Sequence, residues 1–293
     1  MEELKINGKA LYTPKGAAME YGRIGCNFYT GCPHECEYCY LKRGITGKAL
    51  GKTDVTLKKC FKDEEDAIEV FKREINKHKE ECLLHGVFFS FTTDPMIPET
   101  RWLTMRSIVA CRTLGIVPTV LTKNATFLED EERILPLLIA IPKQTRKYVR
   151  IGFTLTGRDD MEPNASTNAK RIKAMDKLHW MGFSTFASIE PVVDWESSMR
   201  VIEQSLPYCD HYKIGLRSGV KKDYYEPVET YKSVVWIKQL IKNAGRTVYF
   251  KESVRQWMLK NVGDELLGLL LDGTVDADGN MISIPLPERF IQH

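Results

Sequence analysis

The sequence predicts an α/β fold in which repeated β-α units build a parallel sheet, closed into a complete or partial barrel. Strand-like runs rich in aromatic and β-branched residues alternate with longer segments whose apolar side chains recur at helical spacing. The strand-like runs also end in polar residues, as barrel strands do on the side that carries chemistry. Parallel strands need crossover connections, so the helices are expected outside the sheet.

In the first half, residues 64–84 repeat apolar side chains every three or four positions among Glu and Lys, which predicts an amphipathic helix. Residues 87–92 read Val-Phe-Phe-Ser-Phe-Thr and predict a strand, which Asp94-Pro95 should stop because proline disfavours regular structure before it. The other elements expected here are strands at 22–30, 116–122 and 148–155, and helices at 100–114 and 128–139.

In the second half, Gly182 should end a helix at 165–181, since glycine suits the left-handed turn at helix ends. Glu190-Pro191 should stop a strand at 183–189. The remaining expected elements are helices at 195–205 and 229–243 and strands at 209–215 and 247–250. Two Asp-Gly pairs between residues 272 and 280 indicate tight turns in a C-terminal cap.

The chain of 293 residues is expected to form one domain, with a lead-in at 1–20, a barrel core at 21–251 and a cap at 252–293. Apolar residues make up 43% and charged residues 28%, an ordinary globular composition. No apolar run is long enough to span a bilayer, and the charged start Met-Glu-Glu-Leu-Lys lacks an apolar targeting region. The expected location is the cytoplasm, where the eight cysteines would be reduced.

Three of these cysteines, Cys32, Cys36 and Cys39, form a C-x₃-C-x₂-C array directly after the first expected strand. Three closely spaced thiolates can hold three irons of a four-iron cluster and leave the fourth iron open for chemistry. The next cysteine, Cys60, lies too far along the chain for ferredoxin spacing. A structural zinc site is the main alternative, but His34 stands too close to the thiols to complete a tetrahedron comfortably. A disulfide framework suits short secreted chains, and the segment is too polar for core cysteines.

The polar residues at the expected strand ends are candidates for the rest of a site, because active sites of barrels gather at the C-terminal ends of strands. Any one of them could simply be a polar strand end, but their recurrence beside the cysteine array favours function. The candidates are Thr93, Asp94, Lys123, Thr154, Glu190 and Arg217.

The cysteine array, with aromatic Tyr38 before its last cysteine, resembles the signature of the radical S-adenosylmethionine (SAM) superfamily. The resemblance implies a partial (β/α)₆ barrel of the radical SAM type. It also implies a [4Fe–4S] cluster on Cys32, Cys36 and Cys39, with SAM chelating the open iron. An electron from a partner such as flavodoxin or ferredoxin would cleave SAM to methionine and a 5′-deoxyadenosyl radical, which abstracts hydrogen from a substrate.

Further segments resemble the spore photoproduct lyase-like branch, whose members are often described as DNA repair photolyases. They are Gly31 to Leu41, Thr92-Thr93-Asp94-Pro95, Leu121-Thr122-Lys123 and Glu162-Pro163-Asn164-Ala165. Ser188-Ile189-Glu190-Pro191 and Tyr249-Phe250-Lys251 look more like a phage-associated radical-SAM-like family of unknown function, which has a longer gap between its first two cysteines. Neither group fixes a substrate.

This resemblance implies roles for five residues at the SAM site. Tyr40 would lie near SAM, and Thr93 and Asp94 would replace the usual Gly-Gly-Glu that holds the SAM amino group. Lys123 would pair with the SAM carboxylate, and Thr154 would lie near the ribose. The roles of Glu190 and Arg217 stay open between a substrate contact, a SAM contact and a mutual ion pair.

One departure concerns the hydrogen donor. Spore photoproduct lyase uses a cysteine shortly before the Thr-Asp-like turn, whereas residues 89–92 here contain no thiol. Activity on spore photoproduct is therefore not expected. Cys26 is a candidate for a redox role, while Cys82, Cys111 and Cys209 are expected to be buried small residues.

The leading functional hypothesis is a radical SAM enzyme, of the lyase or oxidoreductase type, acting on a nucleic acid or nucleotide. Basic stretches at 143–150 and 170–173 support it, although a net charge of only +3 makes no global demand for nucleic acid. The alternatives are a radical SAM enzyme for a small metabolite or peptide, and a non-enzymatic iron–sulfur module.

Overall fold

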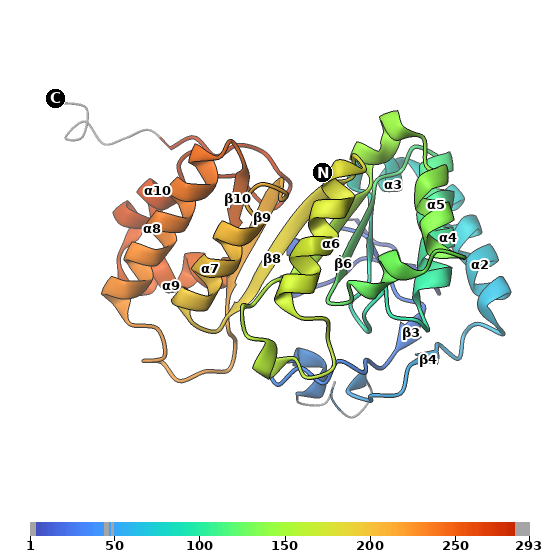
Figure 1. The fold of residues 1–293 in the computed structure, drawn as a ribbon, viewed down its shortest axis with the longest axis horizontal. Coiled ribbons are helices and arrows are strands. Elements are labelled where there is room, and N and C mark those ends of the chain that lie inside the picture. Colours follow the sequence, from blue (N-terminus) through green and yellow to red (C-terminus); the bar gives the residue numbers. More distant parts are fainter. Residues whose placement is uncertain (1–3, 44–46, 48–49, 285–293) are drawn as a thin grey trace. The chain divides into compact units, whose positions relative to one another are not determined.

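The computed structural model describes residues 4–43, 47 and 50–284. Its internal contacts group into two compact units. Figure 1 draws the fold with colours that follow the sequence from blue to red. Unit 1 contains the described residues up to Thr154 together with Arg158–Thr185, and unit 2 contains Leu155–Gly157 together with the residues from Phe186 onward. Residues 1–3 of the expected lead-in and 285–293 of the expected cap lie outside the described residues, and the division into lead-in, core and cap stays a prediction.

Unit 1 is built on a five-stranded, mostly parallel sheet. Its strands lie in the order β1 (Leu11–Tyr12), β2 (Gly25–Cys26), β5 (Val87–Phe89), β6 (Pro118–Thr122) and β7 (Arg150–Thr154). β1 pairs antiparallel with β2, and the other neighbours pair in parallel, with Phe89 opposite Val120 and Thr122 opposite Phe153. A separate antiparallel ribbon joins β3 (Tyr29–Thr30) and β4 (Thr56–Leu57).

The helices of unit 1 are α2 (Glu64–Lys77), α3 (Lys79–His85), α4 (Arg101–Thr113), α5 (Ile134–Ala140) and α6 (Asn168–Trp180). Figure 1 shows α2, α4 and α5 side by side along the outer side of the strands, and α4 contacts both of the others. Asp63 caps α2 by accepting a hydrogen bond from the Asp66 amide at 2.8 Å, which satisfies a free N–H at the helix start. Gly86 ends α3 at φ +69°, a conformation that favours glycine.

Unit 2 is built on three parallel strands: β8 (Ser184–Val192), of which residues 186–192 belong to the unit, β9 (His211–Leu216) and β10 (Thr247–Phe250). Its helices are α7 (Trp195–Ser205), α8 (Pro227–Asn243), α9 (Glu252–Asn261) and α10 (Asp264–Leu271). Asp194 caps α7 by accepting from the Ser197 amide at 2.7 Å, and Glu226 caps α8, which begins with a proline.

The predicted α/β class with parallel strands and alternating helices is confirmed. Five local predictions differ from the structure. The strand expected at 87–92 ends at Phe89. The helix expected at 64–84 is two helices, because His78 leaves the helical conformation at φ −110° and ψ 38°. The strand expected at 22–30 is two short strands, β2 and β3. The helix expected at 128–139 begins only at Ile134, after a 3₁₀ turn over Thr126–Glu129.

The fifth difference is at Glu190-Pro191, where the strand does not stop. β8 continues to Val192, and its register against β9 shifts between Ile189 and Val192. Proline has no N–H for a sheet ladder, so it is tolerated where the pairing is irregular. The turn-rich stretch at 272–280 follows two helices, α9 and α10, that the sequence did not indicate. Among the described residues, none of the helices has the length and apolar character needed to cross a membrane.

Candidate functional site

The three cysteines of the array lie on one loop of unit 1, between β3 and a 3₁₀ turn at Tyr40–Lys42. The loop begins at Gly31, whose φ of +89° and close approach to the Asp54 carbonyl leave no room for a side chain. The amide of Cys32 donates to the Lys52 carbonyl at 2.9 Å, and that of Cys39 to the Cys36 carbonyl at 3.2 Å. The backbone therefore fixes all three cysteines on a single ordered turn.

Burial sets the state of the thiols. It raises the pKa of Cys32 to about 11, and it also raises the pKa of Cys36. The amides of His34 and Asp94 hydrogen-bond the Cys32 sulfur, and the positive charge of Lys123 acts on both thiols; these contacts lower the pKa values in part. The two thiols are protonated at neutral pH, and binding a metal would displace their protons.

Asp94 joins the cysteine loop to the end of β6. Its Oδ1 accepts from the Met96 amide at 2.9 Å and from the Thr122 hydroxyl at 2.7 Å. Its Oδ2 lies 2.9 Å from His34 Nε2 and accepts from the Lys123 amide at 2.7 Å. Burial alone would raise the pKa of Asp94, but these hydrogen bonds and the His34 charge bring it down to about 2. A carboxylate accepts about four hydrogen bonds, so this one has no free position for a SAM amino group.

His34 has a role that the sequence did not indicate. It is buried, and its Nδ1 lies 3.1 Å from the Asn164 carbonyl while its Nε2 faces Asp94. The Asn164 amide group donates to the Pro33 carbonyl at 3.0 Å and to Glu35 Oε2 at 2.9 Å. Both ring nitrogens of His34 thus face oxygen acceptors, and the ring fastens the loop instead of offering a metal ligand.

Of the other expected SAM contacts of unit 1, Thr93, Lys123 and Thr154 lie at or beyond the ends of β5, β6 and β7, and Tyr40 begins the 3₁₀ turn after Cys39. The Thr93 hydroxyl is buried and has no hydrogen-bond partner among the described residues. Lys123 Nζ lies 5.5 Å from the centre of the Tyr38 ring. Thr154 is buried at the end of β7. Tyr40 is 57% exposed, and its hydroxyl donates to the Phe91 carbonyl.

The charge of Lys123 responds to the cysteine loop. Burial alone would lower its pKa, but the acidic groups of Cys36, Glu162 and Asp94 raise it overall. Lys123 therefore stays a cation beside the thiols, which is the state needed to bind a carboxylate.

Two further residues connect the loop to the strands, and sequence reasoning missed both as site residues. Arg171 on α6 is fully buried and lies 2.7 Å from Glu162, which is also buried. The expectation that residues 170–173 form a basic face is wrong for Arg171, because the helix turns this side chain inward while Lys170 and Lys173 stay exposed. The signal for Glu162 was the segment Glu162-Pro163-Asn164-Ala165.

Glu190 and Arg217, the expected site residues of unit 2, do not pair with each other. Glu190 Oε2 lies 2.5 Å from Lys251 Nζ, and Gly215 leaves the space that the Glu190 carboxylate fills. Arg217 forms no ion pair among the described residues, and its Nε is buried without a hydrogen-bond partner there. Lys251 is 2% exposed and was missed as a site residue, although the segment Tyr249-Phe250-Lys251 had been singled out.

No family model matches the chain. An uncharacterized protein of Methanocaldococcus jannaschii is 24% identical over 223 residues, which are 72% of this chain and 76% of that protein. Among solved structures, a cysteine-to-serine variant of spore photoproduct lyase matches with a TM-score of 0.58 and 15% identity, over 86% of this chain and 81% of that one. SuiB of Streptococcus suis bound to S-adenosylmethionine matches with a TM-score of 0.51 and 13% identity, over 79% of this chain. This chain spans about half of the SuiB chain, 48%.

The chain has the fold of the radical SAM enzymes. Both neighbours belong to that superfamily and carry its partial barrel, which confirms the fold expected from the cysteine array. A spore photoproduct lyase variant with bound AdoMet and a dinucleoside spore photoproduct also matches, with a TM-score of 0.52 and 16% identity, over 76% of this chain and 61% of that one.

The described residues fit the cofactors of the radical SAM fold. Three thiols share one loop, Lys123 supplies a cation next to them, and the buried Thr93 hydroxyl lacks a partner. Among the residues described, no three His, Cys, Asp or Glu side chains converge on a single metal ion. A four-iron cluster takes its cysteines on separate irons, so it does not need such convergence.

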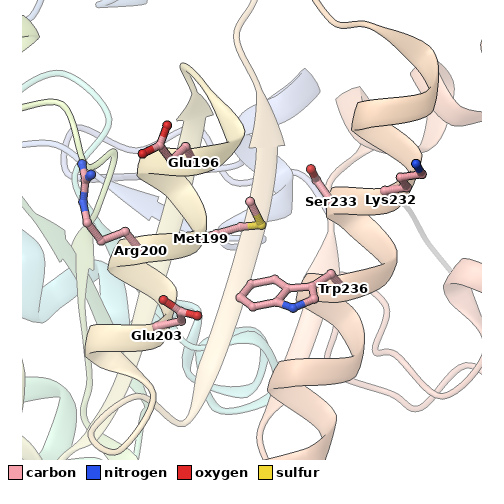
Figure 2. Close-up of a pocket in the computed structure, with 7 residues that line it drawn as sticks. All are labelled: Glu196, Met199, Arg200, Glu203, Lys232, Ser233 and Trp236. Carbon is pink, nitrogen blue, oxygen red and sulfur yellow. The ribbon is translucent and has the colours of Figure 1, made fainter.

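A groove of about 620 Å³ lies on unit 2 between α7 and α8, and none of the residues that line it is an expected site residue. Figure 2 shows Met199 and Trp236 pointing into the space between the two helices, with charged residues around them. The groove is lined by Glu196, Met199, Arg200, Glu203, Lys232, Ser233 and Trp236.

Proposed function

We propose that the protein is a radical SAM enzyme whose Cys32, Cys36 and Cys39 bind a [4Fe–4S] cluster. The observation that carries the proposal is the cysteine loop of unit 1, whose thiols lie beside Lys123 in a radical SAM fold. When bound, the cluster and SAM supply a 5′-deoxyadenosyl radical after transfer of one electron from a donor such as flavodoxin or ferredoxin. The protein binds and orients the cofactors and excludes water.

The side chains of unit 1 divide the binding of SAM among them. Lys123 binds the carboxylate through its retained charge, and the free Thr93 hydroxyl takes the place beside the amino group. Thr154 would contact the ribose, and Tyr40 would lie near SAM. Asp94 acts through the loop that it fastens, because its own carboxylate is fully hydrogen-bonded.

The proposed substrate is a nucleic acid or nucleotide, and the proposed location is the cytoplasm. Support comes from a structural neighbour that binds a dinucleoside and from the exposed Lys143, Lys147 and Arg150. Arg171 no longer counts toward a basic face, which weakens the second basic stretch. Activity on a small metabolite or peptide, and a module without enzymatic activity, are the alternatives that the tests below separate.

Anaerobic reconstitution with iron and sulfide tests the cofactor assignment. Wild-type protein with reductant and SAM should form 5′-deoxyadenosine, and Cys36→Ala should lose both cluster absorbance and this product. Cys60→Ala is the matched control, because Cys60 is an exposed cysteine outside the array. If the loaded wild type yields no 5′-deoxyadenosine, the enzyme assignment fails; turnover by Cys36→Ala would refute the ligand assignment.

Salt dependence tests the substrate class. Binding of labelled DNA or RNA, followed by fluorescence anisotropy, should weaken steeply as salt rises, because phosphate contacts release counterions. An affinity that is the same at low and high salt, or no binding at all, favours a metabolite or peptide substrate.

A further inference from the structure

Arg171 lies in the interior of unit 1, where a buried charge destabilises the fold unless its contacts offset the loss of hydration. Its side chain is 0% exposed, and its guanidinium reaches three separate groups. Nε donates to the Lys123 carbonyl at 3.1 Å, and Nη1 donates to the Thr154 carbonyl at 2.8 Å. Nη2 lies 2.7 Å from Glu162 Oε2, an ion pair whose angles do not meet those of a hydrogen bond. A buried cation needs this combination of an opposite charge and acceptors in fixed directions.

Glu162 carries the contact on to the cysteine loop. Its Oε1 accepts a hydrogen bond from the hydroxyl of Tyr38, which stands between Cys36 and Cys39 in the chain. A backbone hydrogen bond of 3.1 Å from the Glu37 amide to the Met161 carbonyl runs beside it. The chain of contacts thus runs from the cysteine loop, through the segment around Glu162, to Arg171.

The far end of this chain lies at the backbone of two expected SAM contacts. Lys123 directly follows β6, Thr154 ends the neighbouring parallel strand β7, and Arg171 donates to the carbonyl of each residue. The Lys123 carbonyl also accepts from the Ser166 amide at 3.1 Å, so the segment after Glu162 is fastened to the same point. The directions of the Lys123 and Thr154 side chains therefore depend on a guanidinium that is hydrogen-bonded to the backbone of both residues.

We propose that Tyr38, Glu162 and Arg171 form a buried positioning link that couples the order of the cysteine loop to the SAM-binding ends of β6 and β7. The link works by position alone: Arg171 acts through the two carbonyls that it holds, and the Tyr38 hydroxyl acts through Glu162. The identity of the cofactors bound by the loop and by the strand ends rests on the proposed function. The coupling between the loop and the strand ends does not, because it requires only the side chains of the protein. Loosening one end of the link loosens the other.

Hydrogen exchange of the metal-free protein tests the coupling without any cofactor. Tyr38→Phe removes only the hydroxyl at Glu162. Amides in residues 32–43 and in residues 158–166 should both exchange about ten- to a hundredfold faster, as expected for losing a hydrogen bond to a charged group. Tyr29→Phe is the matched control, because it removes another tyrosine-to-glutamate hydrogen bond of unit 1, to Glu64 at 2.7 Å. Exchange that changes only in 32–43, or equally in the control, overturns the coupling.

SAM affinity of the reconstituted protein tests the positioning of the strand ends. Arg171→Lys keeps the charge but cannot hold two carbonyls and Glu162 at once. The variant should retain its iron content and bind SAM about tenfold or more weakly, measured by equilibrium dialysis and by the change that SAM makes in the cluster's electron paramagnetic resonance spectrum. Lys173→Met, an exposed change on the same helix, should match wild type. Unchanged affinity in a folded, iron-loaded Arg171→Lys protein overturns the positioning role.

The two experiments separate the link from the proposed function. Wild-type protein that takes up no iron or binds no SAM would refute the function, and the exchange of the metal-free variants would still decide the coupling. Should Arg171→Lys not fold, Tyr38→Phe is carried into the same dialysis. There the expected loss of SAM affinity is again about tenfold, and an unchanged affinity counts against the link.

Discussion

Replacing Asp94 by Asn separates two roles for this residue, a fastener of the cysteine loop and a ligand of SAM. All four hydrogen bonds of the carboxylate come from donors: the amides of Met96 and Lys123, the Thr122 hydroxyl and the ring of His34. An Asn side chain must turn its NH₂ toward one pair of these donors. The backbone amide that faces the NH₂ loses its acceptor whichever way the Asn side chain turns, whereas the Thr122 hydroxyl or a neutral His34 ring can accept from the NH₂. The variant is expected to destabilise the protein even without cofactors.

The size of the loss follows from those contacts. Hydrogen bonds to a buried charged group contribute about 1.5–3 kcal/mol each, so the lost amide bond alone costs about 1.5–3 kcal/mol. Domains are stable by only about 5–15 kcal/mol, so Asp94→Asn should remove a large share. Thr122→Val removes a single donor at 2.7 Å and should cost a similar amount.

Urea unfolding of the metal-free proteins at pH 7 measures this loss directly. Asp63→Asn is the control: Asp63 also accepts an amide hydrogen bond, at the start of α2, but Asn caps helices equally well there, and stability should change by less than about 0.5 kcal/mol. A loss below about 1 kcal/mol for Asp94→Asn would refute the fastening role. Unchanged stability together with weaker SAM binding would instead return Asp94 to the SAM site.

Two other predictions concern unit 2. Burial raises the pKa of Cys209 to about 12 in the folded protein, whereas the same thiol in the unfolded chain ionises at about pH 9. Between these two pH values only the unfolded state is ionised at this thiol, so the free energy of unfolding falls as the pH rises. Cys209→Ala has no thiol to ionise, so the difference in free energy of unfolding between wild type and variant should narrow by about 1.4 kcal/mol per pH unit between about pH 9 and about pH 12. A difference that stays constant over this range in urea unfolding would contradict the raised pKa of Cys209. Lys251→Met leaves the Glu190 carboxylate, 26% exposed, without its partner at 2.5 Å, and should destabilise by roughly 1–3 kcal/mol. Adding Glu190→Gln should recover part of that loss, and a double-mutant cycle with no coupling would show that the pair contributes nothing.

Much of the fold follows from local pattern. The helix at Trp195–Ser205 and the strand at Thr247–Phe250 have the bounds expected from the sequence, because an amphipathic stripe and an apolar run each define an element within a few residues. The break at His78 and the continuation of β8 through Pro191 were not predictable in this way. Both depend on neighbouring elements that accept a kink or a shift in register.

The sequence by itself determined the cysteine array and the polar ends of the strands, since a motif of eight residues and a strand end are local features. Only the tertiary structure decided what holds them together. His34 meets Asp94 across 60 positions and Tyr38 meets Glu162 across 124, and no spacing rule joins such distant residues. Arg171 stands in a basic run typical of an exposed face, yet its position on α6 turns it inward. There a buried carboxylate and two backbone carbonyls stabilise its charge.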